Sequence, residues 1–180
     1  NLYHPCQALT DLFTIKEKFG TLSRVKVVYL GDGYNNVCHS LMIASHKLGV
    51  RLVISCPREY MPEKSLIRYT RKSIKIEPSP KKAVRGASVL YTDTWFSMGR
   101  MDGRKGRLAA FRPYQLNKKL LSLAKKDAVV MHCLPAFRGF EITNDVLESR
   151  KSIVFEQAEN RLHVQKAILT SIYSNEQNNL

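Results

Sequence analysis

Short apolar, β-branched runs recur along the chain and are separated by stretches with helical periodicity. The apolar runs predict five strands, at residues 25–30, 50–55, 74–76, 88–92 and 128–132. The amphipathic stretches predict helices at residues 5–19, 36–48, 62–71, 114–124 and 157–173. Strands that alternate with helices are typical of a parallel α/β sheet. We therefore expect an α/β fold with a twisted parallel sheet flanked by helices on both faces, a Rossmann-like three-layer sandwich.

Two segments lack this regular pattern. Residues 97–106 are rich in Gly, Arg and Met and predict a mobile loop, and residues after Ser174 form a polar tail. There is no internal repeat.

The turn after the first predicted strand contains Gly31-Asp32-Gly33, which raises the possibility of a dinucleotide site. That fingerprint needs a third glycine three positions beyond the second, where this chain has Asn36. The chain also lacks the G-x-x-x-x-G-K-[ST] phosphate loop. We therefore expect no nucleotide cofactor. Taken alone, the turn indicates a tight strand-to-helix connection whose Asn caps the helix.

Polar residues follow three of the predicted strands. In an open parallel sheet, ligands bind beyond the carboxyl ends of the strands. The residues expected at that edge are Asp32, Asn35, Asn36, Asp93 and Cys133. These side chains predict a polar binding site there.

Bulk composition narrows the class of protein. The net charge of +14 would attract polyanions or phosphorylated metabolites, but the sequence contains no stripe of basic residues interleaved with aromatic ones. A solvated basic surface is therefore favoured over nucleic-acid binding. No apolar run is long enough to cross a membrane, and the four cysteines form no C-x-x-C pair, so we expect an intracellular protein without a metal site.

Several separated motifs together resemble ornithine carbamoyltransferases, members of the aspartate/ornithine carbamoyltransferase family. They are His4-Pro5-Cys6-Gln7, Gly31 to Asn36 with His39-Ser40, Asp93 to Gly99, His132-Cys133-Leu134-Pro135 and Glu159-Asn160-Arg161. The resemblance runs from the first residue to about Tyr173. D-x-x-x-S-M-G followed by H-C-L-P is its most specific part. The resemblance implies transfer of a carbamoyl group from carbamoyl phosphate to the side-chain amine of L-ornithine, giving citrulline and phosphate.

The resemblance also implies an ornithine site. Asp93 and Ser97 would hold the α-amino group, while Asn36 and the backbone of Met98 would hold the α-carboxylate. Fixed partners of opposite charge suit an amino acid, which presents one cation and one anion. Cys133 would lie beside the reacting amine and have a polarising and positioning role, because the amine itself is the nucleophile.

A carbamoyl-phosphate site is implied by a second set of residues. His4 would contact the carbamoyl oxygen and Gln7 the carbamoyl nitrogen, while Cys133, the Leu134 carbonyl and Arg161 would contact the same ligand. A cation and a donor near the carbonyl would stabilise the oxyanion that forms as the amine attacks. Asp93, Cys133 and Arg161 are thus the expected catalytic residues.

Three features depart from the family pattern. The S-T-R-T motif, with which the family clamps phosphate in its first domain, does not occur in this chain. The chain is therefore expected to be an inactive half: residues 1–20 a linking helix, 21–155 the ornithine-binding domain, and 156–180 a helix that packs on the absent first domain. Phe137 also stands where many members have His, and residues 100–107 are strongly basic.

Other activities remain open at this point. A sister enzyme could act on putrescine, aspartate or an acylated ornithine, and a half-protein could bind amino acids without catalysis. The resemblance further implies a homotrimer, or a multiple of trimers, in the cytoplasm, or in the mitochondrial matrix if the source is an animal or fungus.

Overall fold

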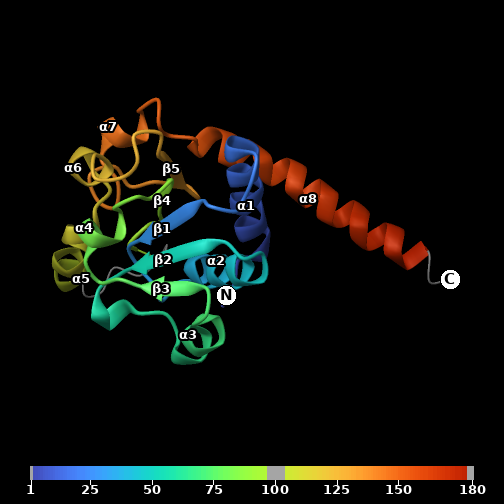
Figure 1. Cartoon of the computed structure of the whole chain (residues 1–180), viewed down its shortest axis with the longest axis horizontal. Helices are drawn as coiled ribbons and strands as arrows, with labels where there is room; N and C mark the ends of the chain where they lie inside the picture. Colours follow the sequence, from blue (N-terminus) through green and yellow to red (C-terminus); the bar gives the residue numbers. More distant parts are fainter. Residues whose placement is uncertain (1, 97–103, 178–180) are drawn as a thin grey trace.

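The computed structural model describes residues 2–96 and 104–177. Its strands form one parallel sheet in the order β3-β2-β1-β4-β5 (Figure 1). The strands are β1 Lys26–Leu30, β2 Arg51–Ser55, β3 Ile74–Ile76, β4 Val89–Thr92 and β5 Val129–His132. Each lies within one residue of its prediction, so the expected α/β fold is confirmed.

Helices cover both faces of this sheet. They are α1 Pro5–Phe19, α2 Asn36–Lys47, α3 Lys64–Thr70, α4 Pro80–Ala83, α5 Arg104–Phe111, α6 Lys118–Leu121, α7 Asn144–Leu147 and α8 Val154–Gln177. Short 3-10 turns occur at Arg58–Tyr60 and Arg112–Tyr114. None of the described helices is both long and apolar enough to cross a membrane.

Alternating strand residues build a separate core on each face. On β1, Val27 and Tyr29 pack with residues of α1, α2 and α3, while Val28 and Leu30 pack with residues of α4, α6 and α7. The two cores place the sheet in the middle of three layers, as predicted.

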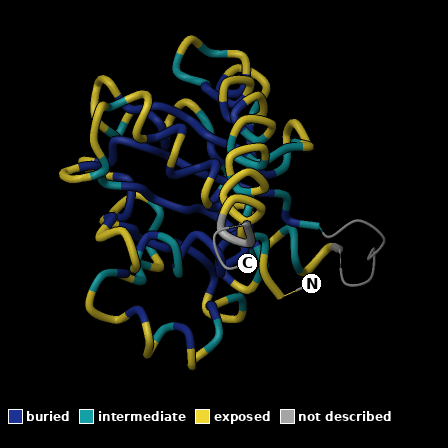
Figure 2. The backbone as a smooth tube through the Cα atoms, turned by 90° about the vertical axis from the view of Figure 1, so that its right-hand side faces the viewer, coloured by how far each residue is buried: buried dark blue, intermediate teal, exposed yellow. Residues whose placement is uncertain are grey.

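The long helix α8 packs against α1 at its beginning and then projects away from the body (Figures 1 and 2). Its described surface carries exposed apolar side chains, namely Phe155, Leu162, Leu169, Ile172 and Tyr173. An apolar groove of about 510 Å³ lies between the two helices, lined by residues such as Leu9, Phe13 and Ile168.

Some predicted helices were wrong in extent. The helix expected at 114–124 is only the single turn of α6, because Leu116 exchanges backbone hydrogen bonds with Glu141 and Thr143 and Asn117 then caps a new helix. Residues 104–106, expected in a loop, begin α5. The sequence pattern also missed α4 and α7. The helix predicted at 157–173 is longer than expected, because α8 starts three residues earlier and continues into the polar tail as far as Gln177.

Candidate active site

Three parallel strands bring their carboxyl ends to one edge of the sheet. Asp32 follows β1 by two residues, Asp93 follows β4 directly, and Cys133 follows β5 directly. Parallel pairing of β1 with β4 and of β4 with β5 sets these ends side by side. The polar edge predicted from the sequence is therefore present.

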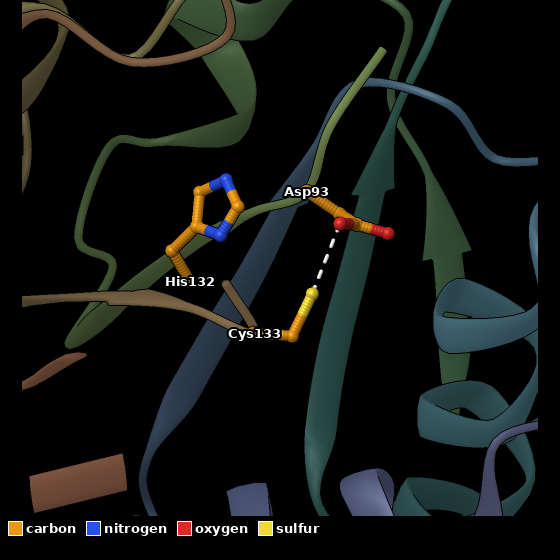
Figure 3. Close-up of side chains that lie close together, drawn as sticks. All are labelled: Asp93, His132 and Cys133. Carbon is orange, nitrogen blue, oxygen red and sulfur yellow. Dashed lines mark hydrogen bonds between the residues drawn. The ribbon is translucent and has the colours of Figure 1, made fainter. Parts of the chain in front are cut away.

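Asp93 is the centre of this edge. Its Oδ1 accepts hydrogen bonds from the Cys133 thiol at 2.9 Å and the Thr94 amide at 2.7 Å, and its Oδ2 accepts from Asn35 Nδ2 at 3.0 Å. Figure 3 shows the Cys133 side chain directed at the Asp93 carboxylate. A carboxylate offers about four lone-pair positions. Since the described residues fill three of them, one remains for another donor.

The Cys133 sulfur is held as a thiol. Burial raises the pKa of Cys133 well above its ordinary value, and the negative charge of Asp93 raises the pKa further. At neutral pH the S–H group is therefore a hydrogen-bond donor to Asp93, because a thiolate there would face a carboxylate at hydrogen-bonding distance. This state suits a polarising contact and does not suit nucleophilic attack.

The two asparagines after β1 differ in what they contact. Asn35 caps α2, its Oδ1 accepting from the Cys38 amide at 2.7 Å, while its Nδ2 reaches Asp93 and Tyr29. Asn36, the residue assigned to ornithine by resemblance, is the partly buried first residue of α2. The sequence interpretation of a capping Asn is thus confirmed, but it missed that this cap also contacts Asp93.

Glycines in the same turn pack against protein atoms. A side-chain carbon on Gly33 would lie 2.7 Å from the Tyr60 carbonyl oxygen and 3.0 Å from Cys56 Sγ. Gly31 has a φ of 127° and lies against Trp95. Both glycines therefore serve close packing of the turn, which explains why a G-x-G occurs here without the rest of the dinucleotide fingerprint.

Residues implied for carbamoyl phosphate gather at the N-terminal end of α1. His4 precedes the helix and donates its backbone N–H to Ser40 Oγ of α2 at 2.6 Å. Gln7 is fully buried, and its Oε1 accepts from Arg161 Nη1 of α8 at 2.9 Å. Burial lowers the pKa of His4, and the positive charge of Arg161 lowers it further against the opposite effect of Asp93. His4 is therefore neutral at physiological pH.

Asp11 was not identified from the sequence. It lies one turn beyond Gln7, is fully buried, and accepts from Gln7 Nε2 and from Gln157 Nε2 of α8, each at 2.7 Å and each through Oδ1. A usable signal existed: Asp11 is an acid four residues after Gln7 and falls on the same side of the helix as the apolar Ala8, Leu12 and Ile15.

The loop after β5 is fixed by a second buried carboxylate, Glu141. Its Oε1 accepts from His132 Nε2 at 3.1 Å and from the Phe137 amide at 2.5 Å, and His132 Nδ1 accepts from the Leu134 amide at 2.9 Å. These bonds hold Leu134, whose φ is 55°, next to Cys133. The Phe137 side chain is exposed, so only its backbone takes part in this anchor.

One group of side chains has the composition of a metal site. Ligand atoms of Asp93, His132 and Cys133 lie within 4.8 Å of one another (Figure 3). Both ring nitrogens of His132 already make hydrogen bonds, one with Glu141 and one with the Leu134 amide. A metal would have to displace one of them, so the geometry favours a positioning histidine.

The remaining assigned residues, Ser97 and Met98, lie outside the described part of the chain. Arg107 lies in α5, the first helix after that segment. It pairs with Asp32, donates to the Trp95 carbonyl, and stacks over the Tyr60 ring at 4.6 Å. Burial nevertheless raises the pKa of Asp32, although Arg107 opposes this. Asp32 thus pairs with Arg107 and accepts from the Tyr34 amide.

Comparison with known proteins matches this geometry to one family. Residues 23–172 match the model of the aspartate/ornithine carbamoyltransferase Asp/Orn binding domain. The chain is 52% identical over 173 residues to ornithine carbamoyltransferase from Pyrococcus horikoshii, covering 92% of this chain and 54% of that protein. The chain is 51% identical to the enzyme from Syntrophus aciditrophicus, in a match that covers 94% of this chain and 57% of that protein.

Solved structures agree. Ornithine carbamoyltransferase from Pyrococcus furiosus superposes with a TM-score of 0.89 at 50% identity, covering 94% of this chain and 56% of that one. The enzyme from Campylobacter jejuni superposes with a TM-score of 0.88 at 34% identity, covering 97% of this chain and 60% of that one. The chain spans a little over half the length of these relatives. On its sequence match and its fold, the chain belongs to the aspartate/ornithine carbamoyltransferase family and contains its Asp/Orn binding domain.

Proposed function

We propose that this chain supplies the ornithine-binding half of an enzyme that transfers the carbamoyl group of carbamoyl phosphate to L-ornithine. The observation that carries the proposal is the Asp93 carboxylate at the edge of the sheet, which has three described donors and one acceptor position left. A buried carboxylate next to a neutral thiol and an amide favours a cationic amine as its ligand. Aspartate carries the same α-ammonium group, so its exclusion depends on its side-chain carboxylate, which needs a cation where ornithine carries its amine.

In the proposed complex, Asp93 and Ser97 hold the α-amino group of ornithine, and Asn36 with the Met98 backbone holds the α-carboxylate. Asn35 keeps Asp93 in place through its bond to Oδ2. The Cys133 thiol lies beside the reacting amine. Because the amine attacks, the thiol positions and polarises, and proton transfer away from the ammonium must precede attack.

For carbamoyl phosphate, neutral His4 would donate to the carbamoyl oxygen, and Arg161 would supply positive charge as that oxygen becomes an oxyanion. Gln7 Oε1 would accept from the carbamoyl nitrogen, and the Leu134 carbonyl would do the same. Since S-T-R-T is absent from the chain, a second domain must supply the clamp for the phosphate dianion.

We infer the domain arrangement and the assembly from the same family membership. Residues 21–155 would form the ornithine-binding domain, with residues 1–20 linking it to the phosphate domain. The exposed apolar face of α8 and its groove with α1 suit a docked domain, since the relatives are almost twice as long as this chain. The complete enzyme is proposed to be a homotrimer, or a multiple of trimers, in the cytoplasm or, in an animal or fungus, the mitochondrial matrix. The four free cysteines suit such a reducing compartment.

Calorimetric titration of this chain tests the amino-acid site directly. L-Ornithine and norvaline, which lacks the side-chain amine, should both bind, whereas putrescine and aspartate should not. Turnover is then measured with the chain joined to the preceding domain of the Pyrococcus furiosus relative, by following citrulline formation.

In that joined enzyme, Asp93→Ala or Cys133→Ala should lower turnover by about 100-fold or more, because misplaced reactants lose rate steeply. Asp145→Asn is the matched control. Asp145 of α7 is an exposed carboxylate that pairs with Lys118 of α6, on the face of the sheet that these two helices cover. Near-normal turnover in both active-site variants would refute the site. Binding of putrescine in preference to ornithine would point to the sister activity.

A further inference from the structure

A continuous chain of hydrogen bonds links the two ligand sites through one buried carboxylate. Arg161 donates to Gln7 Oε1, Gln7 Nε2 donates to Asp11 Oδ1, and Gln157 Nε2 donates to the same oxygen. Gln157 Oε1 in turn accepts from the His132 backbone N–H at 3.0 Å. Asp11 therefore connects α1, α8 and the end of β5, immediately before Cys133.

This series of hydrogen bonds determines which way the Gln7 amide points. A Gln side chain has an oxygen that only accepts and a nitrogen that only donates, and rotation by half a turn exchanges them. Asp11 Oδ1 accepts, so it retains the Gln7 nitrogen, and Arg161 donates, so it retains the Gln7 oxygen. The opposite orientation would set two acceptors together at Asp11, which is fully buried and cannot turn to water, and two donors together at the partly buried Arg161.

A fixed amide oxygen selects for ligands that carry an N–H group. The oxygen of Gln7 accepts one bond from Arg161 and has a second lone pair for a ligand. A carbamoyl group presents an NH₂ donor to it. An acetyl group of similar size presents a methyl, which would leave that second lone pair without a donor.

We propose that Asp11 is a positioning residue that fixes the amide of Gln7 and thereby makes the site select carbamoyl over acetyl phosphate. This inference rests on the proposed function, because it assumes that Gln7 contacts the carbamoyl nitrogen. Asp11 acts through Gln7 and touches no reactant itself.

The test measures selectivity in the joined enzyme described above. KM for carbamoyl phosphate and the inhibition constant of acetyl phosphate are determined for the parent, Asp11→Ala, Asp11→Asn and Thr10→Val. In Asp11→Ala only Arg161 still favours the native orientation of the Gln7 amide, so the preference for carbamoyl phosphate should fall by about tenfold, the effect of losing one oriented hydrogen bond. A structural defect alone would weaken both ligands equally and leave the ratio unchanged.

Two variants serve as controls. Asn keeps one acceptor oxygen, and both amides donate to a single oxygen of Asp11, so Asp11→Asn should retain the preference. Thr10 is equally buried on the same helix and its side-chain hydroxyl donates to the Cys6 carbonyl, away from Gln7, so Thr10→Val should behave as the parent. An unchanged ratio in Asp11→Ala would overturn the proposal.

A second measurement needs neither catalysis nor a variant, so it does not depend on whether Asp11→Ala folds. In ¹⁵N-labelled chain, the side-chain NH₂ of Gln7 should exchange with solvent much more slowly than that of Gln165, which is partly exposed on α8. Equally fast exchange would overturn the Gln7–Asp11 contact itself. If the parent joined enzyme forms no citrulline while Gln7 exchanges slowly, the proposed function fails and the positioning contact stands.

Discussion

The Cys133 side chain shows how a single contact sets the chemistry of a residue. Its sulfur lies 2.9 Å from Asp93 Oδ1, and the side chain is only partly exposed. Both burial and the neighbouring carboxylate favour the thiol over the thiolate. An amine that binds at Asp93 would therefore meet a neutral S–H group.

Alkylation kinetics should report this state. Because only a thiolate reacts, a raised pKa lowers the reactive fraction at a given pH, and Cys133 should react with iodoacetamide at pH 8 at least about tenfold more slowly than a free thiol. Asp93→Asn removes the negative charge, lowers the pKa of Cys133 and should increase the rate. Mass spectrometry of the labelled peptides gives the rate, with the partly exposed Cys6 as an internal reference. A faster reaction of Cys133 than of Cys6 in the parent would contradict the assignment.

The turn from β1 to α2 shows how one element is positioned by close contact. Gly33 allows the backbone to pass the Tyr60 carbonyl and Cys56, and Asn35 then starts the helix and holds Asp93. Any side chain at Gly33 would displace backbone, which cannot adapt as a flexible side chain can. Packing of this turn therefore sets the position of the polar edge.

Two glycine substitutions separate this effect from helix propensity. Gly33→Ala should reduce the free energy of unfolding by about 1–3 kcal/mol, the usual cost of overpacking. Gly106→Ala should increase it by about 0.5–1 kcal/mol, because Gly106 lies exposed in α5 with open space around it and alanine favours a helix. Urea unfolding of both variants measures the difference, and equal midpoints would show that the turn tolerates a side chain.

At the scale of the whole molecule, Asp11 joins helices that are distant in the chain. Asp11 and Gln157 are 146 residues apart, and their bond fastens the start of α8 to α1. The pKa of Asp11 is raised to about 7, chiefly by burial and to a smaller extent by the charge of Asp93, while the hydrogen bonds from Gln7 and Gln157 oppose the rise. The folded protein therefore holds a proton that the unfolded chain releases.

The pH dependence of stability follows from this difference. Between pH 4 and 7 the native state binds more protons at Asp11 than the unfolded state does. The contribution of Asp11 to the free energy of unfolding therefore falls as pH rises and is constant above about pH 7. A pKa shift of this size changes the free energy of unfolding by about 4 kcal/mol at most. Asp11→Asn should become progressively more stable than the parent across this range. Denaturant unfolding at pH 5, 6, 7 and 8 tests it, and a constant difference between the two proteins would place the pKa of Asp11 near its ordinary value.

The sequence by itself determined the five strands, the two long helices and the order of motifs along the edge of the sheet. Apolar alternation and turn residues are local signals, so they predict strands to within one residue. They also placed Asp93 and Cys133 together, because parallel strands end at one edge.

Only the tertiary structure decided which polar groups meet across that edge. Asn35 is the residue that reaches Asp93, which depends on the direction of a side chain in the first turn of α2. Glu141 contacts His132 and Asp11 contacts Gln157 through packing of buried polar groups. Such pairs have no periodicity to reveal them, since each depends on elements that fold against one another from distant parts of the chain.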